Sequence, residues 1–202
     1  MYKKTMIAAA IFLLASLGAK AQFSIDFGDN LPIVTRTNPA GDKGDFSTGI
    51  GFLLGTSYHL NISRHLAVSA GVLYGWNYFK GEDAYVVSGS KIDSGHESHI
   101  MAPVNLELYL GRNRSVYFYA GQLFDYCIAA KGKLKDSGDR VDILADGTYR
   151  PFNLLLGGGI GFNLGLGVFC GAGVYKNTMN YTTVEDTSVD KYLVRIMFAF
   201  TL

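Results

Sequence analysis

Large and small residues alternate with a period of two along most of the chain. In the segment 46–60 the even positions carry bulky residues such as Phe52 and Leu54, whereas the odd positions carry residues such as Gly51 and Ser57. Successive side chains of a β-strand point to opposite faces, so this alternation predicts a strand with one bulky face and one small face. The pattern recurs in the segments 23–28, 66–78, 100–110, 116–130, 152–162, 166–175 and 192–202. We therefore expect about eight strands, because no segment with a helical period stands out beyond the first 21 residues.

The connections between these segments alternate in length. Tight turns alternate with long polar stretches, which are residues 33–45, 80–97, 131–149 and 176–190. Bacterial outer-membrane barrels have an even number of strands, short periplasmic turns and long extracellular loops. The sequence therefore predicts an all-β fold, an eight-stranded antiparallel up-and-down transmembrane β-barrel with both termini on the periplasmic side.

Neither face of the predicted strands carries many charges, which distinguishes the chain from a soluble sheet. A soluble sheet exposes Lys, Glu and Thr on its outer face, and here no helix is available to cover the bulky face. Lipid can cover it, since Lys or Arg on a lipid face at mid-bilayer costs roughly 2 to 4 kcal/mol. Tyr58, Trp76, Tyr78 and Tyr192 fall near predicted strand ends, where interfacial aromatic girdles lie.

The small face predicts a narrow interior. Eight strands enclose a space just wide enough for side chains to fill. Glycines such as Gly157, Gly159 and Gly161 would leave room there for bulky residues such as Tyr117 and Tyr119. A wide open pore is therefore not expected.

The first residues are typical of a secretory signal. Lys3 and Lys4 precede the apolar run 6–17, and small residues at Ala19 and Ala21 suit a signal peptidase. The alternative is a membrane anchor, but the run is too short to span a bilayer as a helix. We expect residues 1–21 to be a signal peptide and residues 22–202 to form the outer-membrane barrel domain.

Composition narrows the possible partners. The chain has 202 residues, of which only 17% are charged, with a formal net charge of +1. A charge so near neutral gives no reason to expect a nucleic-acid partner. Cys127 and Cys170 are expected two strands apart and on opposite faces, a geometry that a disulfide cannot bridge.

Three segments resemble the PorT-like outer-membrane β-barrel family. Residues 99–109 contain a strand with Pro103, residues 116–131 contain an aromatic strand followed by Ala-Gly, and residues 154–162 are rich in glycine. The chain departs from the family pattern at Ala102, where an isoleucine is usual, and at Leu202, where many such barrels end in Phe. The resemblance implies an integral outer-membrane protein of a Gram-negative bacterium. One namesake member is associated with protein secretion, but this implies no role for any residue here.

Four charged residues fall on the small face of predicted strands, and they are Asp26, Glu107, Asp125 and Arg195. We expect them to form a charge cluster in the lumen. Asp26 and Arg195 lie on strands that become neighbours when the barrel closes, which predicts an ion pair, and Glu107 and Asp125 lie on adjacent strands. Buried charges need partners because desolvation costs several kcal/mol per ion. A structural plug of paired charges is favoured over a gated ion path.

Lys131, Lys133 and Lys135 alternate after the aromatic strand. A strand that continues out of the membrane would place all three on one side at the extracellular mouth. Ordinary snorkelling and solvation is the expected role. The alternative is contact with lipopolysaccharide phosphates or an anionic solute.

Metal or cofactor binding is not expected. His96 and His99, with Asp93 and Glu97 nearby, are candidate ligands in the second long connection. An irregular surface loop does not fix ligand geometry, so a solvated loop is favoured.

The sequence also shows no catalytic constellation. It contains no G-x-S-x-G, H-E-x-x-H or phosphate-binding motif. Ser57 with His59, and Ser69 with His65, share a face, but strand spacing places the members of each pair about 7 and about 14 Å apart. Neither pair is therefore expected to form a catalytic dyad, and no enzyme activity is expected.

These patterns predict an integral outer-membrane barrel with a largely filled lumen, acting as a scaffold or interaction protein through its extracellular loops. The alternatives are a narrow porin-like channel for small solutes, or an accessory component of a secretion or transport complex. The expected partners are outer-membrane lipid and lipopolysaccharide, the barrel-assembly machinery during biogenesis, and a protein bound through the loops.

Overall fold

A computed structural model describes most of the chain. The described residues are 21–37, 43–80, 86–87, 90–111, 113–145, 147–184 and 187–202, without the side chains of 21 and 43–46. The predicted signal peptide lies outside them except for Ala21, at which the first strand begins. None of the described residues belongs to a helix long and apolar enough to cross a membrane.

The described chain folds into ten strands, of which eight are long. They are β1 (Ala21–Thr37), β2 (Lys43–Asn61), β3 (Leu66–Lys80), β4 (Val86–Val87), β5 (Ser90–Leu110), β6 (Val116–Leu134), β7 (Arg140–Asp142), β8 (Phe152–Gly165), β9 (Val168–Asn177) and β10 (Ser188–Thr201).

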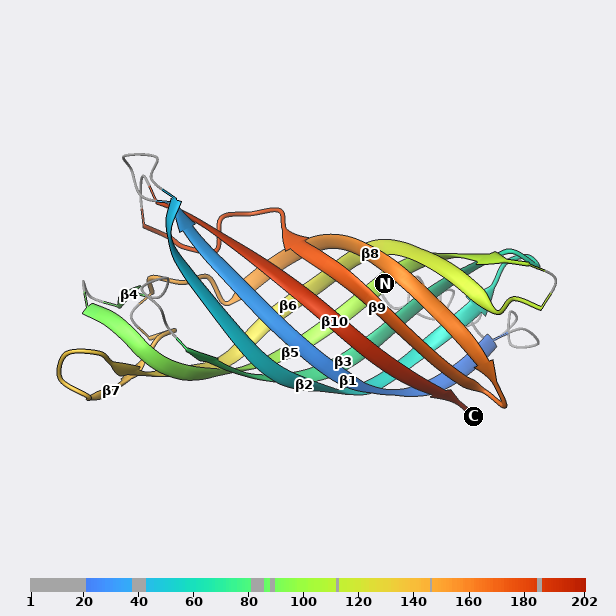
Figure 1. The fold of residues 1–202 in the computed structure, drawn as a ribbon, viewed down its shortest axis with the longest axis horizontal. Helices are drawn as coiled ribbons and strands as arrows, with labels where there is room; N and C mark the ends of the chain where they lie inside the picture. The colour runs from blue at the N-terminus through green and yellow to red at the C-terminus, as the bar shows by residue number, and fades with distance from the viewer. Residues whose placement is uncertain are drawn as a thin grey trace, which may run out of the picture.

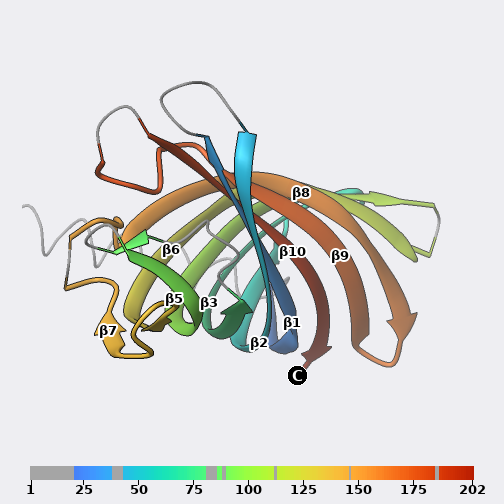
Figure 2. The same ribbon diagram turned by 60° about the vertical axis from the view of Figure 1, so that its left-hand side comes forward.

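The eight long strands form a closed antiparallel ring. Hydrogen-bonded neighbours follow the order β5-β3-β2-β1-β10-β9-β8-β6, and pairing of β5 with β6 closes the ring. The two short strands β4 and β7 pair only with β5 and β6. The predicted eight-stranded up-and-down barrel is thereby confirmed, with two short strands added (Figures 1 and 2).

The two ends of the barrel differ. The connections from β2 to β3, from β5 to β6 and from β8 to β9 are short and lie at the end where β10 finishes, which we call the short-turn end (Figure 1). The opposite end, which we call the long-loop end, carries β4, β7 and the longer connections (Figure 1).

Several strands run further toward the long-loop end than the sequence predicted. Pairing of β1 with β2 continues to Thr37 opposite Lys43, β5 already begins at Ser90, and β6 continues to Leu134. Much of the predicted connections 33–45 and 80–97 is therefore strand, and the prediction of long loops there was wrong. The alternation of bulky and small residues depends on what each face of a strand contacts. It is therefore lost where those contacts change, even though the backbone pairing of the strands continues.

The outer and inner faces of the ring follow the predicted alternation. On β2 the side chains of Ile50, Phe52 and Leu54 are exposed on the outside, while Leu53 and Ser57 are buried inside. On β10 Ile196, Phe198 and Phe200 are likewise exposed, and Leu193 and Arg195 are buried. Apolar side chains thus cover the outside of the ring.

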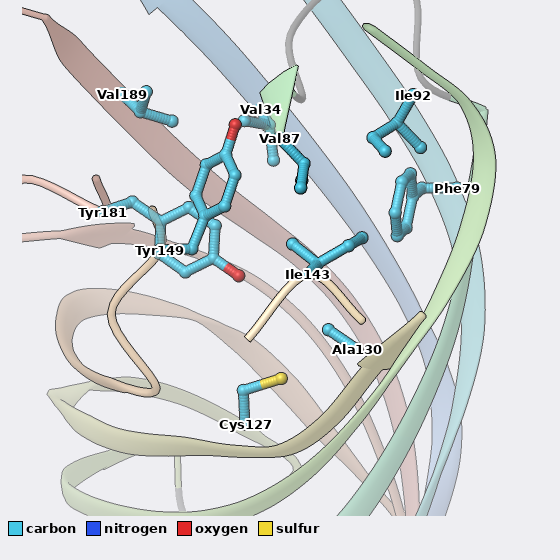
Figure 3. Packing of buried hydrophobic residues seen from close by; sticks show 10 residues of the cluster. All are labelled: Val34, Phe79, Val87, Ile92, Cys127, Ala130, Ile143, Tyr149, Tyr181 and Val189. Atoms are coloured by element: carbon cyan, nitrogen blue, oxygen red, sulfur yellow. The ribbon is translucent and has the colours of Figure 1, made fainter. Parts of the chain in front are cut away.

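Two apolar clusters fill parts of the interior. The first, which we call the apolar layer, crosses the middle of the barrel and contains Leu53, Leu73, Met101, Leu123, Leu155, Tyr175 and Leu193. The second, which we call the apolar cap, fills the long-loop end and contains Val34, Phe79, Val87, Ile92, Cys127, Ala130, Ile143, Tyr149, Tyr181 and Val189. Figure 3 shows Ile143 between the pair Tyr149 and Tyr181 and the pair Phe79 and Ile92.

Cys127 belongs to the apolar cap, whereas Cys170 lies on β9. Strand β8 separates β6 from β9, and both cysteines are free thiols. The two cysteines are therefore two strands apart in the ring, as the sequence predicted.

Glycines opposite tyrosines make the interior close-packed. Gly161 pairs with Tyr117 on the neighbouring strand, and a Cβ added at Gly161 would meet only atoms of the Tyr117 ring among its three nearest contacts. A larger side chain at 161 must therefore displace that ring.

We expect Gly161→Leu to lower the free energy of unfolding by about 1 to 3 kcal/mol through overpacking. Adding Tyr117→Ala should recover part of this loss, because it vacates the space that the new side chain needs. Thermal unfolding in detergent micelles measures both effects. Strictly additive losses in the double variant would show that the two positions do not share space.

Candidate functional site in the polar interior

The predicted lumen charges Asp26, Glu107, Asp125 and Arg195 are all buried inside the ring. They do not form one cluster. Along the β5–β6 ladder, Glu107 stands opposite Tyr119 and Asp125 opposite Met101, so the two carboxylates lie at different levels of the barrel.

The expected ion pair between Asp26 and Arg195 is not formed. Asp26 pairs with Ala199, whereas Arg195 pairs with Asn30, further along β1. Asp26 instead accepts a hydrogen bond of 2.7 Å from the Ser24 hydroxyl. Among the described residues Arg195 makes no ion pair, and its Nη2 contacts the Met197 sulfur at 3.0 Å. The prediction considered which strands are neighbours but not their register, which places the two side chains at different heights.

Asp125 belongs to a buried ion network of four residues, Glu97, His99, Asp125 and Lys191. Lys191 Nζ lies 3.1 Å from Glu97 Oε2 and 3.7 Å from Asp125 Oδ2. His99 bridges the two carboxylates, with Nε2 3.0 Å from Glu97 Oε2 and Nδ1 2.8 Å from Asp125 Oδ1. The Tyr181 hydroxyl donates to Glu97 Oε1 at 3.0 Å. This network lies between the apolar layer and the apolar cap, so its charges can be balanced only by one another and by the polar groups beside them.

Three members of this network were not predicted to lie in the lumen. Glu97 and His99 were assigned to a loop, and Lys191 was not singled out. Lys191 has the same parity as Leu193 and Arg195, and Glu97 and His99 have the same parity as Glu107. Extending the alternation by a few residues on each strand would have placed all three inside.

The candidate metal ligands His96 and His99 do not come together. Both lie in β5 rather than in a loop, and His99 is buried in the ion network. The ring of His96 instead stacks with that of Trp76, with 6.3 Å between their centroids. Within the part of the chain that the structure describes, no group of three or more His, Cys, Asp or Glu side chains suits a metal ion.

Lys131, Lys133 and Lys135 are exposed. Strand β6 contains one extra residue opposite the step from Ser98 to His99 of β5. Beyond this register shift Gly132 lies on the inner side, next to Ile92 and Ile143. Lys131 and Lys133 therefore lie on the outer side of the wall rather than inside the mouth, and Lys135 follows in the turn after β6. Lys131 and Lys133 line a groove of about 570 Å³ together with His96 and Arg140.

A second polar group occupies the short-turn end. Ser57 Oγ lies 2.7 Å from Ser24 Oγ and 3.1 Å from His59 Nε2. His59 Nδ1 lies 3.2 Å from Glu107 Oε1. The expectation that Ser57 and His59 stand too far apart to interact was therefore wrong. Strand spacing gives the distance between neighbouring positions on one face, but the long His59 side chain reaches back along the strand to the Ser57 hydroxyl.

These residues line a cavity of about 80 Å³. Its walls include Asp26, Glu107, Tyr117 and Arg195. Aromatic rings narrow it toward the short-turn end, because the Phe169 ring lies 6.3 Å from that of Tyr117 and 6.4 Å from that of His59.

The apolar layer separates the cavity from the ion network. Along β10, Lys191 of the network is followed by Leu193 of the layer and then by Arg195 of the cavity. Along β6 the same order runs from Asp125 through Leu123 to Tyr119. The ion network and the cavity therefore lie at different levels of the described interior.

We expect Lys191→Met to lower the free energy of unfolding by about 3 to 5 kcal/mol, because it leaves two buried carboxylates with one histidine. Combining it with Glu97→Gln should cost less than the sum of the single changes. The control is Lys176→Met, since Lys176 pairs with Asp190 at 3.2 Å with its side chain 49% exposed. That variant should unfold at nearly the wild-type temperature. Equal losses at Lys191 and Lys176 would contradict a stabilising role for the network.

The sequence matches no family model and no curated protein. Among solved structures it is similar to Neisserial surface protein A, with 14% identity, coverage of 90% of this chain and 99% of that chain, and a TM-score of 0.50.

Two further solved structures are similar at lower TM-scores. The attachment invasion locus protein Ail of Yersinia pestis has 16% identity, 90% and 99% coverage and a TM-score of 0.49. The outer membrane protein OprG of Pseudomonas aeruginosa has 16% identity, 92% and 98% coverage and a TM-score of 0.43. Together with the closed ring, the similarity to Neisserial surface protein A shows that this chain has the fold of small outer-membrane β-barrels.

Proposed function

We propose that the protein is an integral outer-membrane β-barrel that acts as a scaffold or interaction protein through its long-loop end. The observation that carries this proposal is the filled interior. The side chains of the apolar layer come from seven of the eight ring strands, and each is at most 2% exposed. A path for solutes through the barrel would have to displace them.

The outer surface supports the membrane location. Val104, Leu106 and Leu108 stand exposed along β5, and Phe118 and Phe124 along β6. Exposed apolar patches of this extent are unusual on soluble monomers. A closed ring leaves no unpaired strand edge, which a hydrocarbon environment requires. We place the short-turn end, where β1 begins and β10 ends, on the periplasmic side, because outer-membrane barrels have their short turns there.

The connections at the long-loop end are tied to one another, which suits a binding surface. Tyr149 and Thr182 form a β-bridge, and Thr182 Oγ1 donates to the Thr148 carbonyl at 2.8 Å. The Val86 amide donates to the Tyr149 hydroxyl at 2.9 Å. Tyr149 and Tyr181 also pack in the apolar cap. Three connections are thus held on one apolar core, and they present a preorganised surface to a protein partner.

The exposed groove with Lys131, Lys133 and Arg140 suits the phosphates of lipopolysaccharide, since it lies on the outer side of the wall at the long-loop end. The barrel-assembly machinery is the expected partner during biogenesis. Membership of the PorT-like family, and a role as an accessory component of a secretion or transport complex, fit this architecture and rest on the sequence resemblance.

Leu106→Lys should block assembly into the outer membrane, because it places an ammonium group on the lipid-facing side at a cost of roughly 2 to 4 kcal/mol at mid-bilayer. The matched control is Asn105→Lys, which places the same group in the cavity that Glu107 lines. Heat-dependent gel mobility of outer-membrane fractions should show folded protein for the control only. Similar assembly of both variants would mean that lipid does not cover the outer face.

Purified protein in a planar bilayer should give no steady single-channel steps, because the apolar layer closes the lumen. Steady steps would overturn the filled-lumen proposal in favour of a narrow porin-like channel. A Leu123→Gly and Leu155→Gly double variant, which thins the layer, provides a comparison for any leak.

A further inference from the structure

Three side chains on the cavity wall have the arrangement of a serine nucleophile, its general base and an orienting carboxylate. Ser57 Oγ lies 3.1 Å from His59 Nε2, and the other ring nitrogen of His59 lies 3.2 Å from Glu107 Oε1. The Tyr109 hydroxyl donates to Glu107 Oε2 at 2.8 Å, which holds the carboxylate in place. Nucleophile, base and orienting group within hydrogen-bond reach are the geometric signature of nucleophilic catalysis, whatever the fold.

Ser57 is better placed than its neighbour Ser24 to be the nucleophile. Ser24 Oγ lies 3.5 Å from His59 Nε2 and donates its proton to Asp26 Oδ1 at 2.7 Å. Ser57 Oγ is nearer to the imidazole, and it can direct its own proton either to Ser24 Oγ or to His59 Nε2.

Arg195 supplies a positive charge to the same cavity. It is 2% exposed and lines the cavity, and its Nε has no hydrogen-bond partner among the described residues. Backbone N–H groups in a paired strand are used by the ladder, so an oxyanion in this lumen must be stabilised by side chains. The Arg195 guanidinium can take that role without giving up an existing ion pair.

The site lies near the short-turn end, so we expect substrate to enter from that side, past the rings of Phe169 and Tyr117. Ser57 and His59 stand near the end of β2; Ser57 is buried, with 9% of the residue exposed, whereas the His59 side chain is 19% exposed. The cavity measures about 80 Å³. Since an engineered cavity of about 150 Å³ holds benzene, a space of this size suits an acyl group of only a few atoms.

We propose that this cavity is an acyl-transfer site that hydrolyses short-chain acyl esters, with Ser57 as nucleophile, His59 as general base, Glu107 as a positioning residue and Arg195 as oxyanion stabiliser. This activity is separate from the scaffold role and does not require the lumen to conduct.

The reaction proceeds in two balanced steps. Ser57 Oγ attacks the carbonyl carbon while its proton passes to His59 Nε2. The bond to the alcohol oxygen then breaks, and His59 returns the proton to that leaving oxygen. Water attacks the resulting serine ester, giving a proton to His59, which passes it to Ser57 Oγ as the ester bond breaks. The net reaction converts one ester and one water into one carboxylic acid and one alcohol.

The test uses the refolded full chain in detergent micelles and methanesulfonyl fluoride, a reagent small enough for the cavity. Peptide mass mapping should find the sulfonyl group on Ser57. Ser24→Ala should still be labelled at Ser57, and Ser57→Ala should not be labelled. Ser63→Ala, which removes an exposed hydroxyl in the nearest tight turn, is the matched control and should be labelled like the wild type.

Hydrolysis of p-nitrophenyl acetate gives the second measurement. We expect Ser57→Ala and His59→Gln each to lower kcat/KM by about 100-fold or more, and Arg195→Met to lower kcat by a similar factor. Glu107→Gln should lower kcat with little change in KM, and Glu107→Asp should recover part of the loss. Heat-dependent gel mobility confirms that each variant is folded.

Three outcomes would overturn the proposal. They are absence of label on the folded wild type, label spread over several serines, and hydrolysis that persists in folded Ser57→Ala.

Discussion

Closure of the sheet through the β5–β6 pair is the constraint on which the rest of the structure depends. Once the ring is closed with eight strands, its circumference is set and its interior is narrow. Every inward side chain must then either be small, pack against an apolar neighbour or find a polar partner, because little room is left for solvent. This chain meets the requirement in three ways. It places glycine opposite Tyr117, it packs the apolar layer, and it pairs buried charges in the four-residue ion network.

The ring and its faces could be predicted because strand parity is a local property. A residue such as Phe52 or Arg195 shows which side of the wall it occupies through its immediate neighbours in the sequence. The heights of side chains along the barrel could not be obtained in this way, since they depend on register between strands. Asp26 and Arg195 illustrate the difference, because their strands are neighbours but the side chains stand at different levels.

The candidate sites were missed for two different reasons. The inward direction of Glu97 and Lys191 could have been predicted from the alternation along their strands. The polar residues around them suggested a loop instead, so the strands were not extended that far. The contact of Ser57 with His59 depends on a side-chain conformation that no spacing rule contains. Rules based on positions along a strand therefore underestimate which functional groups can meet when one of them is as long as histidine.

The register shift in β6 opposite Ser98 and His99 reverses which residues of this strand face the interior. On one side of it, odd-numbered residues such as Asp125 and Cys127 face the interior; on the other, odd-numbered Lys131 and Lys133 face outward and Gly132 faces the interior. The extra residue thus shifts the alternation of inward and outward side chains by one position in the rest of β6. Basic groups that an unbroken alternation would have directed into the barrel are directed away from it, and the vacated interior is left for Ile143 of a returning connection. Because of this one residue, the long-loop end of the barrel is filled by the apolar cap instead of being lined by Lys131 and Lys133.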